Sequence, residues 1–338
     1  MNVAFIIRLI LSYVLCLYYN AKYIVLIILS ILLKGSTRTL EVKDRPTPPA
    51  ILQNPQYGNH KYITVNGIKL HYVEKGDQNK PLMLFVHGFP EFWYSWRHQI
   101  VEFSKDYWCI AVDMRGYGDS DKPKGLASYK MDNMVDDLRA LVKGLGRERV
   151  TLVCHDWGAV IGWRYILRHM ETVEKYVMIG APAMEVYGWI AQREWDQFRK
   201  GWYVFFFKAP LIPEMALRTN DLSIFKAMKT ESTTDEDIEA FKYTFAKPKA
   251  LTYPLNYYRA NAFGQVSRIK KKPEKYAPGL YLLGEKEAFI SLSTGPAMEK
   301  VYPNLTYKLV PRATHFAQQD KPTLVNEMMR NFLTSSTK

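Results

Sequence analysis

The sequence contains little cysteine and no nucleic-acid-binding motif. Its three cysteines, Cys16, Cys109 and Cys154, cannot build a disulfide framework, and no C-x-x-C pair suggests a zinc site. The formal net charge is +13, but the basic residues are spread along the 338-residue chain. A basic solvated surface that suits an anionic membrane explains this charge better than a nucleic-acid site. We therefore expect no nucleic-acid partner and no metal site.

Extensive disorder is excluded as well. Hydrophobic residues make up 48% of the chain and charged residues 23%, which is typical of a folded globular protein. A chain of this length allows one large domain or two ordinary ones. Nothing in the sequence indicates the oligomeric state.

The N-terminal segment Met1–Leu33 is almost entirely apolar. After Asn2, only Arg8, Asn20 and Lys22 interrupt it. About 20 apolar residues suffice for a helix to cross a bilayer. A secretory signal would be shorter and would end at small residues, which the sequence around Leu33 does not offer. We therefore predict a retained single-pass membrane anchor over residues 1–34, with membrane lipid as its partner.

The charges that flank this segment predict its orientation. Lys34, Arg38, Lys43 and Arg45 follow the anchor, whereas Arg8 and the amino terminus precede it. The positive-inside rule then places the rest of the chain in the cytosol, as in an endoplasmic reticulum membrane, and the lack of paired cysteines agrees. The glycosylation sequon at Asn304 argues for the lumen, but such a tripeptide often arises by chance.

The rest of the chain shows the pattern of an α/β protein. A proline-containing linker is expected over residues 35–57, followed by a β-hairpin that turns at Asn66-Gly67. Continuous apolar runs then predict buried parallel strands at Leu82–Val86, Trp108–Val112, Val150–Cys154, Tyr176–Ile179 and Leu280–Leu283. Helical patterns are found at Asn133–Leu145, Ala159–His169 and Pro322–Leu333. Alternating strands and helices predict a doubly wound sheet flanked by helices.

This alternation stops over residues 183–250, which are rich in aromatic residues, Lys and Glu. We interpret this stretch as an inserted helical cap between two parts of the core, residues 58–182 and 251–338. The cap would lie over the carboxyl ends of the strands, where α/β sheets bind ligands.

The strongest functional signal is Cys154-His155-Asp156-Trp157-Gly158. It follows a predicted buried strand and precedes a helix, which is the pattern of a nucleophile elbow with Asp in place of Ser. The alternative is an Asp that only caps the following helix, and these five residues alone do not decide between the two.

Two further segments favour the catalytic interpretation. His87-Gly88-Phe89-Pro90 follows a predicted strand, at the place where such a sheet supplies one backbone N–H of an oxyanion hole; Trp157, after the nucleophile, would supply the other. His315 follows a strand predicted at Leu305–Leu309 and occupies the position of the catalytic base. Its acidic partner should lie after Leu283, where both Glu285 and Glu287 are available.

With these segments in place, the chain resembles the α/β-hydrolase-fold epoxide hydrolases, and its apolar N-terminus resembles their membrane-anchored branch. The resemblance runs from about Tyr62 to Leu333 and is carried by His87–Ile100, Asp113–Pro123, Cys154–Ala159, Pro254–Arg259 and Ala313–Pro322. It implies Asp156 as the nucleophile, His315 as the base and Glu287 as the acid that orients His315. Most members of that family have Asp at the position of Glu287.

The resemblance also implies two epoxide-binding tyrosines in or beside the cap, Tyr203 and Tyr258. Tyr257, which is adjacent to Tyr258, is the alternative candidate for the role of Tyr258. Trp93, Trp96 and Trp157 would line an apolar substrate pocket. Such chemistry needs no metal or organic cofactor.

An Asp nucleophile suits substitution at an alkyl carbon. A carboxylate that attacks an epoxide leaves an ester, which water can hydrolyse, whereas a serine would leave an ether. The expected product is a vicinal diol from a lipophilic epoxide, which fatty acids or xenobiotics could supply; lipid metabolism and detoxification are the corresponding roles. The alternatives are a haloalkane or haloacid dehalogenase with the same Asp–His–acid set, and a catalytically silent membrane-bound binding protein of the same fold.

Overall fold

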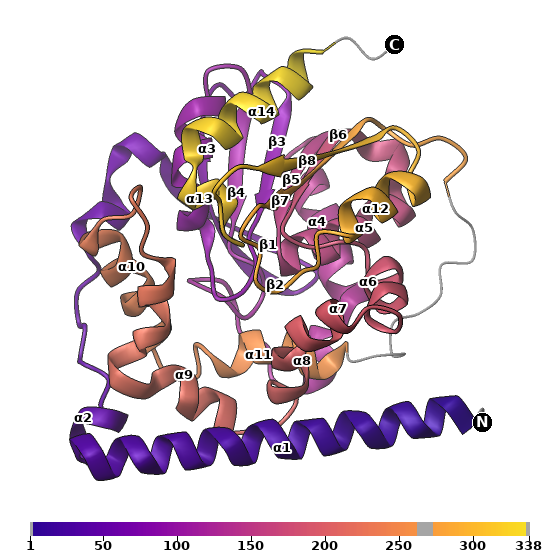
Figure 1. Ribbon diagram of the computed structural model, residues 1–338. Coiled ribbons are helices and arrows are strands. Elements are labelled where there is room, and N and C mark those ends of the chain that lie inside the picture. The colour runs from indigo at the N-terminus through magenta and orange to yellow at the C-terminus, as the bar shows by residue number, and fades with distance from the viewer. Residues whose placement is uncertain (1–2, 262–272, 336–338) are drawn as a thin grey trace.

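The computed structural model describes residues 3–261 and 273–335 (Figure 1). Eight strands form a single sheet in the order β1-β2-β4-β3-β5-β6-β7-β8. The strands are β1 Asn59–Val65, β2 Ile68–Lys75, β3 Leu82–Val86, β4 Trp108–Val112, β5 Val150–His155, β6 Val173–Ile179, β7 Gly279–Gly284 and β8 Leu305–Val310. Strand β2 pairs antiparallel with β1 and β4, and all the other pairs are parallel.

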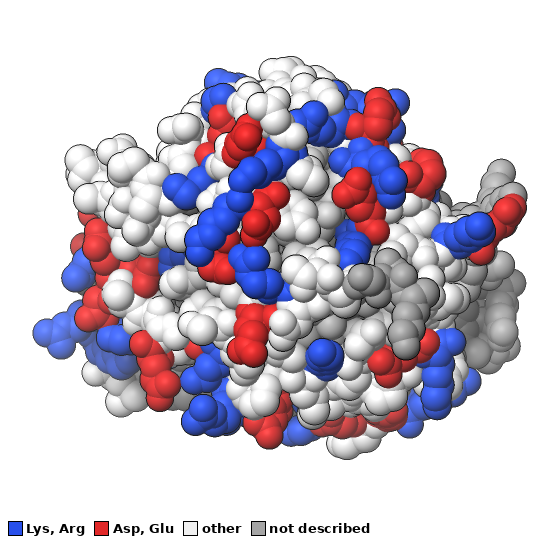
Figure 2. All heavy atoms as spheres, turned by 90° about the horizontal axis from the view of Figure 1, so that it is seen from above, with Lys and Arg blue, Asp and Glu red and all other residues white. Residues whose placement is uncertain are grey.

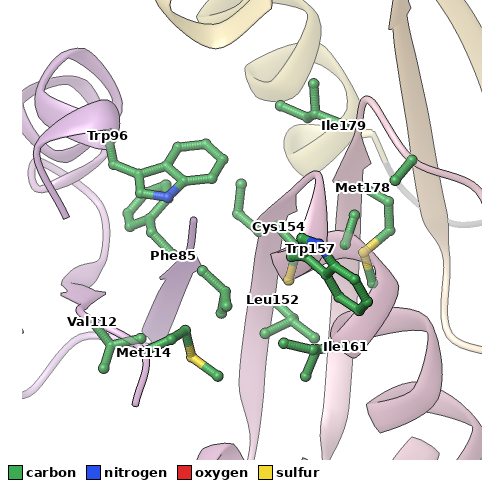
Figure 3. Close-up of a cluster of buried hydrophobic side chains, with 14 of the residues drawn as sticks. Phe85, Trp96, Val112, Met114, Leu152, Cys154, Trp157, Ile161, Met178 and Ile179 are labelled. Atoms are coloured by element: carbon green, nitrogen blue, oxygen red, sulfur yellow. The ribbon is translucent and has the colours of Figure 1, made fainter. Parts of the chain in front are cut away.

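Helices cover both faces of this sheet, since every residue of β3, β4, β5 and β7 is buried. The covering helices are α3 Arg97–Phe103, α4 Met131–Gly144, α5 Trp157–His169, α12 Thr294–Val301, α13 Ala317–Asp320 and α14 Pro322–Thr334. Figure 3 shows part of the core, where Phe85 of β3 and Leu152 of β5 lie among side chains from the neighbouring elements. The predicted α/β architecture is confirmed.

The predicted hairpin is confirmed too. Asn66 and Gly67 connect β1 to β2 with φ angles of 50° and 71°, which are the left-handed values that a type I′ turn requires. The main differences from the sequence-based boundaries are at the starts of elements. Helix α5 begins at Trp157, directly after the proposed nucleophile, because the elbow turns into the helix with no intervening loop.

A run of helices separates β6 from β7. These are α6 Met184–Ala191, α7 Trp195–Lys200, α8 Trp202–Phe206, α9 Ile212–Leu222, α10 Asp235–Ala246 and α11 Thr252–Ala260. Helix α11 lies after residue 250 and contacts the 3-10 turn at Leu126–Tyr129 in the core. The helices α8, α9 and α11 lie below the sheet in Figure 1.

The N-terminal helix α1 (Val3–Lys34) lies along these helices and is followed by the short helix α2 (Ser36–Leu40). It contacts α8 and α9. Within the described residues, Ile10–Lys34 is the one helical stretch that is long and apolar enough to cross a membrane. The face of the molecule opposite α1 carries basic and acidic side chains intermixed (Figure 2).

Candidate active site

Asp156 lies on a sharp turn between β5 and α5. Its φ of 50° is unusual for a residue other than glycine and indicates local backbone strain. The turn needs small neighbours. A Cβ on Gly158 would lie 2.2 Å from the carbonyl oxygen of Val86, and a Cβ on Gly88 would lie 2.4 Å from the Cβ of Asp156. The elbow geometry expected from the sequence is therefore present.

His315 lies between two carboxylates. Its Nε2 is 3.4 Å from Oδ2 of Asp156, and its Nδ1 is 2.8 Å from Oε2 of Glu287. The other oxygen of Glu287 accepts a hydrogen bond from the backbone N–H of Phe289. Glu285, the other candidate acid, instead accepts a hydrogen bond from the N–H of Arg312. The structure thus brings Asp156, His315 and Glu287 together and leaves Glu285 outside this group.

The charges in this group favour an ionised nucleophile beside a protonated histidine. Burial raises the pKa of Asp156, but the hydrogen bond and positive charge of His315 outweigh burial and hold this pKa below its usual value. Burial lowers the pKa of His315, but the charge of Glu287 and the hydrogen bonds to Asp156 and Glu287 raise it well above its usual value. Both pKa shifts thus stabilise a pair of opposite charges, a carboxylate on Asp156 and an imidazolium on His315.

The backbone N–H of Phe89 donates a 2.8 Å hydrogen bond to Oδ1 of Asp156. Trp157 is the first residue of α5. Its N–H is one of the first-turn donors that have no acceptor within a helix. The two predicted oxyanion-hole residues thus follow the ends of two neighbouring strands, Phe89 after β3 and Trp157 after β5.

Tyr203 of α8 and Tyr258 of α11 face each other, with ring centroids 6.0 Å apart. Tyr258 also lies against Trp157 and Phe89, at 5.0 and 5.8 Å between centroids. Burial, followed by nearby phenol and carboxylate charges, raises the pKa of both tyrosines well above 10. Both side chains are therefore neutral phenols that can donate a hydrogen bond or a proton.

Tyr257 has a different position. Its hydroxyl donates a 2.8 Å hydrogen bond to the backbone carbonyl of Arg115, and its side chain is 1% exposed. This bond fixes the phenol in the junction between α11 and the core. The structure therefore separates the adjacent tyrosines, and Tyr258 is the one that contacts Trp157 and Tyr203 together.

The structure does not place Trp93 and Trp96 beside the two tyrosines. The ring of Trp93 packs on Tyr57 and His60, and Trp96 is completely buried against Phe85 (Figure 3). The short 3-10 helix at Trp93–Trp96 turns these side chains into the core. The expectation that they line the substrate pocket is therefore corrected.

Other aromatic rings occupy the neighbourhood instead. Phe207 lies 5.0 Å from Tyr258, and Phe289 lies 5.3 Å from Tyr203 and 5.1 Å from His315. Sequence reasoning did not single out either residue. Phe289 could have been found from its place in the loop that carries Glu287, whereas Phe207 is one of three consecutive phenylalanines and had no distinguishing signal.

A buried polar network behind the site was also missed. His155 has its Nδ1 2.6 Å from Glu91 and its Nε2 2.9 Å from the backbone carbonyl of His315. Glu91 also accepts hydrogen bonds from the N–H of Gly88 and from the side-chain amides of Gln318 and Gln319. These bonds tie together the loops that carry the oxyanion donor, the nucleophile and the base. Both His155 and Glu91 are within the motifs that the sequence displays.

Comparison with known proteins agrees with this arrangement. Residues 81–322 match the family model of the alpha/beta hydrolase fold. Epoxide hydrolase 3 of Xenopus tropicalis is 39% identical over 90% of this chain and 86% of its own length. Human epoxide hydrolase 4 is 36% identical over 90% of this chain and 87% of its own length.

Solved structures give the same result. The chain superimposes on the Bacillus megaterium epoxide hydrolase, crystallised with an inhibitor, with a TM-score of 0.74 and 33% identity over 81% of this chain and all of that one. The fold, the Asp–His–Glu arrangement and these relatives lead to one conclusion: the chain belongs to the epoxide hydrolases of the α/β-hydrolase fold.

Proposed function

We propose that this enzyme converts lipophilic epoxides to vicinal diols through a covalent ester on Asp156. The observation that carries the proposal is the position of His315, whose Nε2 lies 3.4 Å from the Asp156 carboxylate while Glu287 accepts a hydrogen bond from its other nitrogen. An Asp nucleophile with its own base can form an ester and then hydrolyse it.

In the first step, a carboxylate oxygen of Asp156 attacks an epoxide carbon and the C–O bond of the ring breaks. The electron pair of that bond goes to the epoxide oxygen. Tyr203 and Tyr258 are neutral buried phenols, and one of them donates its proton to this oxygen. The products of the step are a hydroxyalkyl ester on Asp156 and a tyrosinate.

The ester then changes the state of His315. Part of the elevated pKa of this histidine comes from its hydrogen bond to the Asp156 carboxylate and from the charge of that carboxylate. Esterification removes this negative charge, so the pKa of His315 falls. The imidazolium returns its proton to the tyrosinate and becomes a neutral base.

In the second step, neutral His315 takes a proton from a water molecule that attacks the ester carbonyl. The negative charge that develops on the carbonyl oxygen is stabilised by the backbone N–H groups of Phe89 and Trp157. Removing one such donor typically costs about 3 kcal/mol of transition-state stabilisation. The tetrahedral intermediate then collapses with cleavage of the acyl C–O bond, and the leaving alkoxide takes the proton of the His315 imidazolium and departs as the diol. The proton that remains on the acid of Asp156 passes to His315, which restores the carboxylate and the imidazolium.

The substrate class follows from the surroundings of the site. The rings of Phe89, Trp157, Phe207 and Phe289 surround the two tyrosines, and such apolar contacts suit a lipophilic epoxide. The apolar helix α1 agrees, because lipophilic epoxides partition into membranes. We propose that the enzyme is membrane-bound and that the helices over residues 183–250 form the cap over the site.

A turnover panel tests this function. Purified full-length enzyme is incubated with lipid epoxides, aromatic epoxides and chloroalkanes, and diols, alcohols and chloride are quantified. We expect diol formation from lipophilic epoxides and none with Asp156→Ala. Chloride release without diol formation would identify a dehalogenase, and binding without turnover would identify a silent relative.

A further inference from the structure

Helix α1 presents its polar side to the protein and its apolar side outward. The side of α1 that faces the protein is a stripe of buried or half-buried residues that recur every three or four positions or are adjacent, and it includes the polar residues Ser12, Asn20 and Ser30. The stripe consists of Ser12, Leu15, Cys16, Tyr19, Asn20, Tyr23, Ile27, Ser30 and Ile31. Most of the exposed residues are large and apolar, and they include Leu17 at 71%, Val25 at 54%, Leu29 at 47% and Leu32 at 76%. A helix in water would show the opposite polarity. The outer side of α1 therefore requires an apolar covering.

The polar stripe is bonded to the cap along the length of the helix. The Nζ of Lys208 donates to the Ser12 hydroxyl at 2.8 Å, and the side-chain amide of Asn20 donates to the backbone carbonyl of Phe206 at 3.2 Å. The ring of Tyr23 stacks on that of Phe206 at 4.3 Å. At the far end, Lys34 bonds to Asn220.

These contacts conflict with a helix that crosses the bilayer. Ser12 and Lys34 lie about 33 Å apart, at a rise of about 1.5 Å per residue. This distance slightly exceeds the full thickness of the hydrocarbon, which is about 30 Å. A crossing α1 would therefore hold α8, α9 and the connection between them inside the hydrocarbon, together with Lys208, Glu214 and Arg218, which are charged residue types.

Lys22 points to the same conclusion. It is exposed and lies midway along the apolar stretch Ile10–Lys34. In a crossing helix its ammonium would lie at the centre of the bilayer, which is the least favourable depth for a charge. In a helix parallel to the surface, its flexible stem reaches the headgroups from any position along the helix.

We propose that α1 lies in the plane of the membrane, with its outer side in one leaflet and its polar side against the cap, so that the enzyme is attached to one face of the bilayer and does not cross it. This replaces the single crossing expected from the sequence. The occupant of the exposed apolar face is bilayer lipid. The segment after the apolar stretch exposes three basic side chains, Lys34, Arg38 and Lys43, beside two acidic ones, Glu41 and Asp44, and its excess of positive charge complements anionic headgroups. The face opposite α1 carries basic and acidic side chains intermixed (Figure 2).

This arrangement brings the cap to the membrane surface. Helix α8, which contacts α1 through Phe206, also carries Tyr203. If the proposed function is correct, an epoxide dissolved in the leaflet lies beside the cap that covers the site.

Topology is tested in sealed microsomes that contain the full-length protein in a Cys16→Ser background. Cys109 and Cys154 are completely buried, so this background is the unlabelled control. One cysteine is introduced at either end of the chain, as Asn2→Cys or Ser335→Cys, and each variant is treated with a membrane-impermeant maleimide. We expect the same result for both variants, either labelling before detergent or labelling only after it. Labelling of one variant alone would show a crossing helix and overturn the proposal.

Lipid contact is tested by flotation with vesicles of phosphatidylcholine and phosphatidylserine. The double variant Leu17→Glu/Leu29→Glu should lose flotation, whereas Ser12→Ala, on the cap side, should keep it. Retained flotation of the double variant would overturn the proposal. Circular dichroism of both variants shows whether the body is folded, and neither test uses turnover, so failure here is distinguishable from failure of the proposed chemistry.

Discussion

Glu287 and His315 form a buried hydrogen-bonded pair, with Oε2 of Glu287 2.8 Å from Nδ1 of the imidazole and both residues at most 5% exposed. Glutamate is one methylene longer than aspartate. The second oxygen of Glu287 accepts a hydrogen bond from the N–H of Phe289, which folds this longer side chain back onto its own loop. The acid thus keeps one oxygen on the imidazole and the other on the backbone.

The first prediction concerns this pair. Glu287→Gln removes the charge that raises the pKa of His315, so the histidine becomes a weaker base, and we expect the turnover number to fall about 10²–10⁴-fold. Glu287→Asp keeps the charge and should lose less. Steady-state kinetics with a lipophilic epoxide measure both variants, and equal losses would argue that the charge is unimportant.

The second prediction separates the adjacent tyrosines. Tyr258→Phe removes a proposed proton donor, so ester formation should slow about 10²-fold or more in single-turnover experiments while ester hydrolysis changes little. Tyr257→Phe is the matched control: it loses the bond to the Arg115 carbonyl and should lower the free energy of unfolding by about 1 kcal/mol with the proton donor intact. Equal slowing of both steps by Tyr258→Phe would contradict its role.

The third prediction concerns the base. His315 is proposed to act only after the ester has formed, so His315→Gln should allow the ester to form and then persist. Intact-mass spectrometry after mixing with a substrate epoxide should show the enzyme with one substrate added. Peptide mapping should locate the addition at Asp156. An unmodified enzyme that still consumes the epoxide would refute the assignment.

The fourth prediction is a pH dependence of stability. The pKa of His315 is higher in the folded than in the unfolded protein, so its contribution to stability is complete below the pKa of the unfolded state and is lost as pH rises through the pKa of the folded state. The pKa of Asp156 is lower in the folded protein, so its contribution is present above the pKa of the unfolded state. Both contributions are complete between about pH 4 and pH 6.5. Chemical denaturation should show the largest advantage of the wild type over His315→Gln in this window, decreasing at alkaline pH. A constant advantage at every pH would show that the pair does not titrate as described.

Local motifs explain how much of the site could be predicted. The positions of Asp156 and Phe89 follow from short segments in which a buried strand ends and a small residue is required, so neighbouring residues suffice. The choice between Glu285 and Glu287 could not be made from the residues alone, because both are in one turn and only the backbone path shows which carboxylate faces His315. The family resemblance supplied that choice in advance.

Predictions that depend on distant contacts were less successful. Trp93 and Trp96 are close in sequence to the oxyanion loop, but the direction of their side chains is set by core packing against Tyr57 and Phe85. The apolar composition of α1 indicates a membrane helix, but its position along the helices of residues 183–250 depends on Asn20 and Ser12, which bond to residues 186 and 196 positions away. A hydropathy pattern does not predict which distant residues will form hydrogen bonds with a helix.

The covalent ester is the central claim, and one turnover in water enriched in heavy oxygen tests it directly. With enzyme in excess over a lipophilic epoxide, we expect the label in the carboxylate of Asp156, where water attacks the acyl carbon, and unlabelled diol. Label in the diol and none in the Asp156 peptide would mean that water attacks the epoxide itself, and the covalent mechanism would be refuted.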